Sequence, residues 1–169
     1  MFTSKHYAQA KVAFQRAGRS REVAICHAFL LREIARAVPD DQVGKRADDF
    51  SSAGEAFRTC ASRSLPGQKR ERLAYFTNAA ECFVQGDMWE AAGDCFLQVE
   101  QYSKAACAYR EDGCFDKMVN VLERHGDQIE PGLLAQLTKV AQMNYFKVSN
   151  PSTIGDKITK NEGPSGGQG

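Results

Sequence analysis

Aromatic residues recur at a fixed interval of 13 residues through the middle of the chain. The four are Phe76, Trp89, Tyr102 and Phe115. In the first three units, an alanine follows three residues later and a second aromatic follows seven residues later, giving Ala79 and Phe83, Ala92 and Phe96, and Ala105 and Tyr109. Self-similarity at a fixed period is the sequence signature of a repeat architecture. The repeat therefore limits the chain to folds built from one recurring element.

The same spacing occurs twice in the preceding part of the chain. It is present in Tyr7, Ala10 and Phe14, and again in Phe50, Ala53 and Phe57. Offsets of three and seven residues fall on one face of an α-helix, so each set predicts an amphipathic helix. No alternating run of β-branched residues is long enough to favour a strand. The sequence predicts an all-α protein of about eight helices.

The interval of 13 residues suits one short helix and one tight turn. A helix of about ten residues is about 15 Å long, and three more residues make the turn. Short connections favour antiparallel neighbours, so two units form one helical hairpin. Small side chains at the crossing let helix axes approach to the lower end of the usual 8–10 Å, which explains the alanines. Because a single hairpin leaves its apolar face uncovered, we expect the hairpins to stack.

Local signals place several helix ends. Gly18 suits the left-handed position that follows a helix, and Pro39 ends the second helix because the residue before proline disfavours helical geometry. A third helix is expected over 43–62. After a loop at 64–67 a fourth helix begins, and Pro131 fits the first turn of the last helix.

Composition divides the chain into a helical part, 1–147, and a polar segment, 148–169. The second is rich in Gly, Ser, Asn and Lys and has few bulky apolar residues. Such a segment buries too little to offset its ordering entropy, so we expect a disordered tail or a linker in a longer chain.

Charge is uneven along the chain although the net charge is only +1. Residues 1–72 carry 14 basic and 8 acidic residues, whereas residues 73–169 carry 8 and 13. This asymmetry is compatible with solvated helix faces or with an electrostatic docking surface.

The six cysteines show no Cys-x-x-Cys pair and no zinc-ligand spacing. We interpret them as buried free thiols that behave as small apolar side chains. No apolar signal segment and no membrane-spanning run is evident. Reduced thiols then favour an intracellular protein, cytoplasmic or nuclear, without a membrane partner.

Motifs for catalysis are absent from the sequence. It contains no phosphate-binding glycine loop, no dinucleotide-binding motif and no zinc-protease motif. His6, His27 and His125 are far apart and show no metal-ligand pattern, and His27 is interpreted as a partly buried histidine. We therefore expect no enzyme, no catalytic or metal-binding residue and no cofactor.

The repeated residues resemble the first-helix signature of tetratricopeptide-type repeats. Trp89, Ala92, Gly93 and Phe96 match it, and so do Tyr102, Ala105, Ala106 and Tyr109. The resemblance implies a right-handed α-solenoid of antiparallel helical hairpins. Two units here span 26 residues, whereas the family repeats at about 34, so the chain resembles a divergent, tetratricopeptide-like member.

A narrower resemblance covers residues 79–83, 89–92, 102–110 and 115–118. These segments are similar to the helical repeat region of large fungal UvrD-like helicase proteins, which are related to the tetratricopeptide-and-ankyrin-repeat-containing proteins. Since the sequence holds no helicase ATP-binding motif, the resemblance implies an accessory, non-catalytic segment of a larger helicase-like protein.

The leading functional hypothesis is a protein-interaction or scaffold module, monomeric or part of a larger chain, whose groove binds a partner protein or peptide. Polar first-helix positions are the candidate partner-binding residues, namely Asn78, Glu81, Glu90, Asp94, Lys104 and Arg110. One alternative is a structural spacer packed on a helicase core. The other is weak nucleic-acid contact through the basic N-terminal half, which includes the short cluster Lys69-Arg70-Glu71-Arg72.

Overall fold

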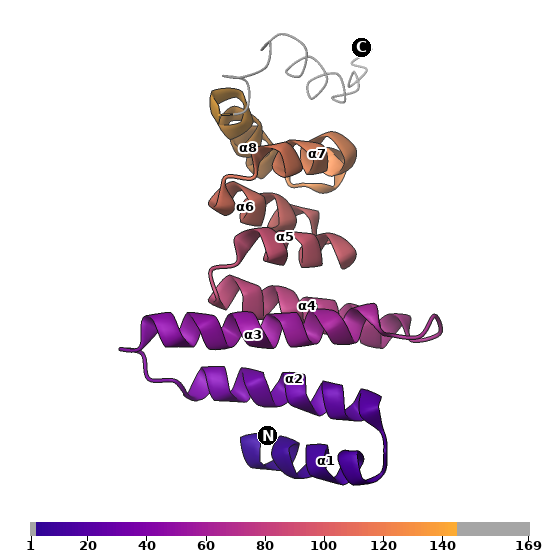
Figure 1. The fold of residues 1–169 in the computed structure, drawn as a ribbon. Coiled ribbons are helices and arrows are strands. Elements are labelled where there is room, and N and C mark those ends of the chain that lie inside the picture. The colour runs from indigo at the N-terminus through magenta and orange to yellow at the C-terminus, as the bar shows by residue number, and fades with distance from the viewer. Residues whose placement is uncertain (1–2, 145–169) are drawn as a thin grey trace, which may run out of the picture. The chain divides into compact units, whose positions relative to one another are not determined.

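The computed structural model describes residues 3–144, and these residues form α-helices joined by short connections, with no strand in that range (Figure 1). The helices are α1 (Ser4–Arg16), α2 (Ser20–Ala37), α3 (Val43–Ser62), α4 (Lys69–Gln85), α5 (Trp89–Gln98), α6 (Tyr102–Asp112), α7 (Phe115–His125) and α8 (Pro131–Asn144), with a 3₁₀ turn, η1 (Gly126–Gln128), before α8. The prediction of an all-α protein is confirmed. The predicted tail, 148–169, lies outside the described residues.

The 13-residue interval is repeated in the backbone of the connections as well as in the side chains. Asp87, Glu100 and Gly113 all have left-handed backbone geometry, with φ of 56°, 60° and 75°. Each lies two residues before the aromatic that begins the next helix. In each, the backbone N–H donates to the carbonyl three residues earlier, at 3.1–3.3 Å. Three consecutive connections therefore share one turn geometry.

Helix ends elsewhere follow the predicted signals. Gly18 has a φ of 69° and follows α1 by two residues, where a left-handed residue terminates a helix. α2 ends at Ala37, two residues before Pro39, and Val38 takes extended geometry as expected before proline. Ser20 is the first residue of α2, and no side chain caps that helix.

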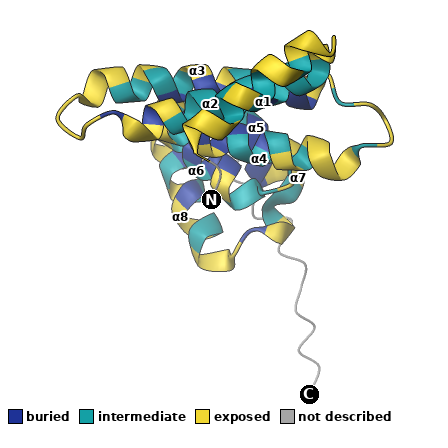
Figure 2. Ribbon diagram, turned by 90° about the horizontal axis from the view of Figure 1, so that it is seen from below, coloured by how far each residue is buried: buried dark blue, intermediate teal, exposed yellow. Residues whose placement is uncertain are grey.

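The described helices belong to two compact units, which divide after Glu100. In the first unit α1 packs on α2, α2 on α3, α3 on α4, and α4 on α5. Buried positions recur at helical spacing in α2 to α5, so each of these helices has a buried side and an exposed side (Figure 2). No residue of α1 is fully buried. Phe57 and Phe83 are fully buried. Phe29 of α2 links Tyr7 and Phe57, stacking on the first at 5.2 Å and meeting the second edge-on at 5.0 Å between ring centroids.

Most repeat residues of the first unit lie in its core. The buried ones are Phe50, Ala53, Phe57, Phe76, Ala79, Phe83, Ala92 and Phe96. Those only half-buried are Tyr7, Ala10 and Phe14 of α1, together with Trp89 at the start of α5. The terminal helix α1 has one packing neighbour in its unit, α2, which explains why its aromatic face keeps some exposure.

The second unit contains α6, α7 and α8, with η1 between the last two. Ala105 and Tyr109 of α6 are buried, whereas Tyr102 and Phe115 are half-buried. The Tyr102 ring stacks on the imidazole of His125 with 3.8 Å between centroids and 7° between planes. This stack joins the first residue of α6 to the last residue of α7.

His27 of α2 forms a contact that makes the first unit sensitive to pH. Its Nδ1 lies 3.1 Å from the Nζ of Lys11 on α1, so the neutral imidazole accepts a hydrogen bond from the ammonium group. Burial lowers the pKa of His27, and the Lys11 charge lowers it further. A protonated imidazole would place two positive charges side by side.

Acidification is therefore expected to weaken the first unit through His27. Because the folded pKa is lower than the unfolded value of about 6.5, the unfolded chain binds more protons below that pH, and stability falls as pH falls. Comparing denaturant unfolding of the wild type and His27→Gln at pH 7.5 and pH 5 isolates this contribution, since other groups are common to both. The wild type should lose more stability on acidification, and equal losses would contradict the assignment.

Candidate functional site

A groove in the first unit crosses α4 between α3 and α5, and we call it the α4 groove. Its inner pocket has a volume of about 340 Å³ and is lined by residues of α3, α4 and α5, including Arg58, Asp94 and Cys95. Its outer pocket, of about 530 Å³, is lined by the loop before α4, the first turns of α4 and the end of α5. Arg72 and Gln98 line both pockets and form their common wall.

Two arginines of the inner pocket are held in place by aromatic rings beneath them. The Arg58 guanidinium lies 5.4 Å from the centroid of Phe83, and the Arg72 guanidinium lies 5.6 Å from that of Phe76. Both distances are within the range of a cation–π interaction. Arg58 Nη2 also donates to both carboxylate oxygens of Glu55 at 2.7 Å. Burial of the rings thus fixes where the two positive charges lie.

Arg72 differs from Arg58 because its charge is not neutralised. Its closest polar contact is a long hydrogen bond, 3.5 Å, from Nη2 to Oε1 of Gln98. Among residues 3–144 no carboxylate pairs with Arg72, and the same is true of Lys69, one turn earlier on α4. Because residues three apart share a helix face, both cations lie on the edge of the outer pocket.

The outer pocket combines these cations with apolar residues and with the polar side chains of Ser64, Gln98 and Glu100. Leu65, Pro66, Leu73 and Val99 contribute to its lining, and Leu65 is 60% exposed. Gln68 holds the loop in place, since its Oε1 accepts a hydrogen bond from the Leu65 backbone N–H at 3.2 Å. The same oxygen accepts a hydrogen bond from Arg21 of α2. An exposed leucine on a loop anchored in this way offers a preformed apolar contact.

Cys95 forms part of the inner wall and does not act as a nucleophile at neutral pH. Burial raises the pKa of its thiol to about 12, an effect only partly opposed by the Arg58 charge. The thiolate is the reactive form of cysteine, and a thiol with this pKa stays protonated.

Of the six residues predicted to bind a partner, Asp94 lines the α4 groove. Asn78 of α4 is engaged within the first unit, because its Oδ1 accepts a hydrogen bond from Arg32 of α2 at 2.6 Å. Glu81 and Glu90 are exposed on α4 and α5. The other two, Lys104 and Arg110, belong to α6 of the second unit, where Arg110 pairs with Glu111 at 2.9 Å.

The residues that form the groove were only partly visible in the sequence. Lys69 and Arg72 belong to the basic cluster Lys69-Arg70-Glu71-Arg72, whose sequence suggested weak contact with nucleic acid. A further signal is the spacing of Arg72 and Phe76, four residues apart, which places a cation over a repeat aromatic on one helix face. Leu65 could have been identified less readily as a groove residue, because the only indication in the sequence is that it is an apolar residue in a loop.

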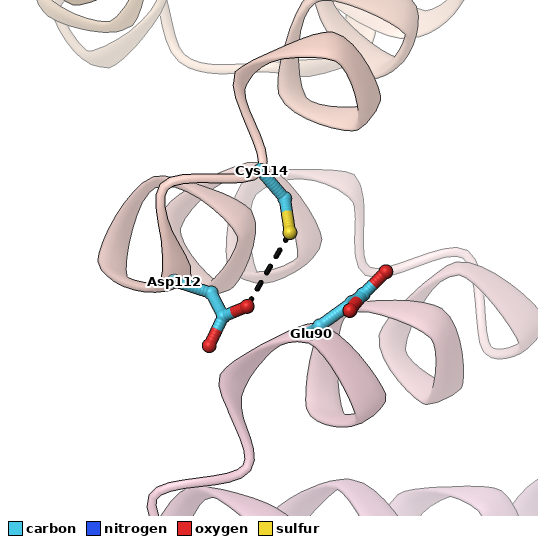
Figure 3. Close-up of side chains that lie close together, drawn as sticks. All are labelled: Glu90, Asp112 and Cys114. Carbon is cyan, nitrogen blue, oxygen red and sulfur yellow. Dashed lines mark hydrogen bonds between the residues drawn. The ribbon is translucent and has the colours of Figure 1, made fainter.

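In the second unit, the thiol of Cys114 donates a hydrogen bond to the carboxylate of Asp112, with Sγ and Oδ2 3.3 Å apart (Figure 3). Glu90, also drawn in Figure 3, is an exposed residue of the first unit. The Cys114–Asp112 contact joins the end of α6 to the residue that precedes α7.

None of the helices in residues 3–144 combines the length and the apolar character needed to cross a bilayer. Comparisons with known proteins found no match to the chain among protein-family models, curated proteins or solved structures.

Proposed function

We propose that this chain is a non-catalytic protein-interaction module and that the α4 groove binds a short segment of a partner protein. The observation that carries the proposal is the common wall of the two pockets, where the unneutralised Arg72 adjoins an exposed apolar surface. Arginine is enriched among the residues that dominate binding energy at protein interfaces. A charged anchor beside an apolar contact suits a peptide better than it suits a small metabolite.

The architecture proposed for the module is tetratricopeptide-like. In each unit the helices would pair as antiparallel hairpins of a right-handed α-solenoid. The short connections, of two or three residues, and the buried alanines at equivalent positions support this arrangement. Repeat proteins of this kind bind partners along surfaces formed by successive repeats. The module would serve as an accessory segment of a larger, intracellular, helicase-like protein.

Selection from an unbiased library tests the interaction proposal. Random 12-residue peptides displayed on phage would be selected on the full chain, and calorimetry would measure the affinity of the enriched sequences. Arg72→Ala and Leu65→Ala should each weaken binding about tenfold, which corresponds to about 1.4 kcal/mol. Lys45→Ala, at an exposed position of α3 outside the groove, serves as the control. Failure to enrich any peptide, or equal affinity for all variants, would count against the proposal.

A further inference from the structure

We propose that the α4 groove binds a peptide with an acidic side chain close in sequence to a bulky apolar one. The carboxylate would lie against Lys69 and Arg72, and the apolar side chain would cover Leu65 in the outer pocket. This inference rests on the proposed function and specifies the class of partner.

Charge around the groove carries the first part of the inference. Residues 58–72 contain five basic residues, Arg58, Arg63, Lys69, Arg70 and Arg72, and one acidic residue, Glu71. Arg58 is already paired with Glu55. Lys69 and Arg72 have no carboxylate partner within residues 3–144, although both line the outer pocket. A carboxylate from another molecule would complete these two contacts.

Preorganisation favours a carboxylate at Arg72. A guanidinium binds a carboxylate through two parallel hydrogen bonds, which a lysine ammonium cannot do. The Arg72 guanidinium already lies over the Phe76 ring, and Phe76 is itself buried. Because the side chain is positioned before binding, less conformational entropy is lost when the partner arrives.

The apolar part of the partner is specified by the rest of the outer pocket. Leu65 is 60% exposed, and Pro66, Leu73 and Val99 lie around the same pocket. A leucine or phenylalanine of the partner would remove this surface from water, which is favourable in proportion to the apolar area buried. A peptide that carried only acidic residues would leave this surface exposed.

Acidic residues on the α5 side of the groove favour a peptide over nucleic acid. Asp94 lines the inner pocket together with Arg58 and Arg72, and Glu100 lines the outer pocket together with Lys69 and Arg72. A phosphate backbone has one negative charge per nucleotide and binds surfaces on which cations follow one another. In the α4 groove such a backbone would meet the carboxylates as well as the cations. A single carboxylate avoids that repulsion.

Fluorescence anisotropy with defined probes tests the inference on the full chain. The first probe is a fluorescein-labelled 12-residue peptide of Ser and Gly with one Asp next to one Phe at its centre. One matched peptide replaces the Asp by Asn, and another replaces the Phe by Ser. We expect the acidic, apolar peptide to bind at least tenfold more tightly than either analogue, and increasing salt should weaken it.

Protein variants assign the effect to the groove. Lys69→Glu and Arg72→Gln should each weaken the first probe at least tenfold, whereas Lys45→Glu, the same charge reversal at an exposed site of α3, should leave it unchanged. Thermal melting of each variant separates lost binding from lost folding. Substitution of Lys69 should not disturb the fold, because its side chain is exposed and contacts no carboxylate within residues 3–144.

Three outcomes would overturn the inference. If library selection enriches neutral or basic peptides that still depend on Arg72 and Leu65, the module binds peptides and only the assigned chemistry fails. If no peptide binds at all, the proposed function fails with it. If a labelled single-stranded oligonucleotide binds in a manner that depends on Lys69 and Arg72 while the acidic peptide does not, the groove is a nucleic-acid contact.

Discussion

Replacing Ala92 by glutamate is expected to destabilise the first unit by about 3–5 kcal/mol. Ala92 lies in α5, which packs on α4, and it is fully buried. A glutamate there would bury a charge without a partner in a crossing that has space only for a methyl group. Protonation of the carboxyl would reduce the cost but would still leave a polar group in an apolar contact.

Urea unfolding followed by tryptophan fluorescence measures this effect. Trp89 is the only tryptophan of the chain and begins the same helix, so its emission reports directly on α5. The matched control is Ala74→Glu, which makes the same change at an exposed position of α4 and should alter stability by less than about 0.5 kcal/mol. A loss below about 0.5 kcal/mol for Ala92→Glu would refute close packing at this crossing.

Gly86→Ala is the second substitution with a large expected effect, about 1–3 kcal/mol of lost stability. A Cβ at this position would lie 2.4 Å from Ser51 Oγ, 2.9 Å from the Ala47 carbonyl oxygen and 2.9 Å from the Ser51 backbone nitrogen. The Ser51 hydroxyl can rotate, but the two backbone atoms belong to α3 and cannot move alone. Relief would require α3 to separate from the end of α4.

Gly44→Ala provides the control for Gly86→Ala. Gly44 lies in α3, whereas Gly86 is the residue that follows α4, and a Cβ at Gly44 would meet nothing within 4 Å. Alanine should leave stability unchanged or raise it slightly, because glycine is the poorer helix former. Because φ at Gly86 is −92°, which any residue can adopt, a difference between the two variants comes from packing. Equal effects of the two would show that α3 and the end of α4 are not in close contact.

Local features of this chain could be read from its sequence because they depend on neighbours in sequence. The predicted range 43–62 coincides with α3, and Trp89 begins α5, since amphipathic spacing and turn residues act over a few positions. The left-handed conformation of Glu100 could not be anticipated, because glutamate seldom adopts positive φ. The only indication in the sequence is that Glu100 lies 13 residues from both Asp87 and Gly113, and Gly113 is a residue type that adopts positive φ readily.

The candidate site was less predictable, because it depends on residues distant in the chain. Periodicity shows which side chains face the core but not which exposed ones converge. The α4 groove brings together Arg58, Arg72 and Gln98, which come from three different helices. Asn78 shows the same limitation. It occupies a polar first-helix position, yet its amide is engaged by Arg32, 46 residues earlier.

The turn geometry common to Asp87, Glu100 and Gly113 makes a helix and its connection an interchangeable cassette. Insertion or loss of one whole cassette would leave each remaining left-handed residue two positions before its own helix. An insertion of any other length within a helix would instead displace the alanines and aromatics from the face that they share. Duplication can therefore lengthen such a chain only by whole helix-and-connection units if the connections are to keep their geometry.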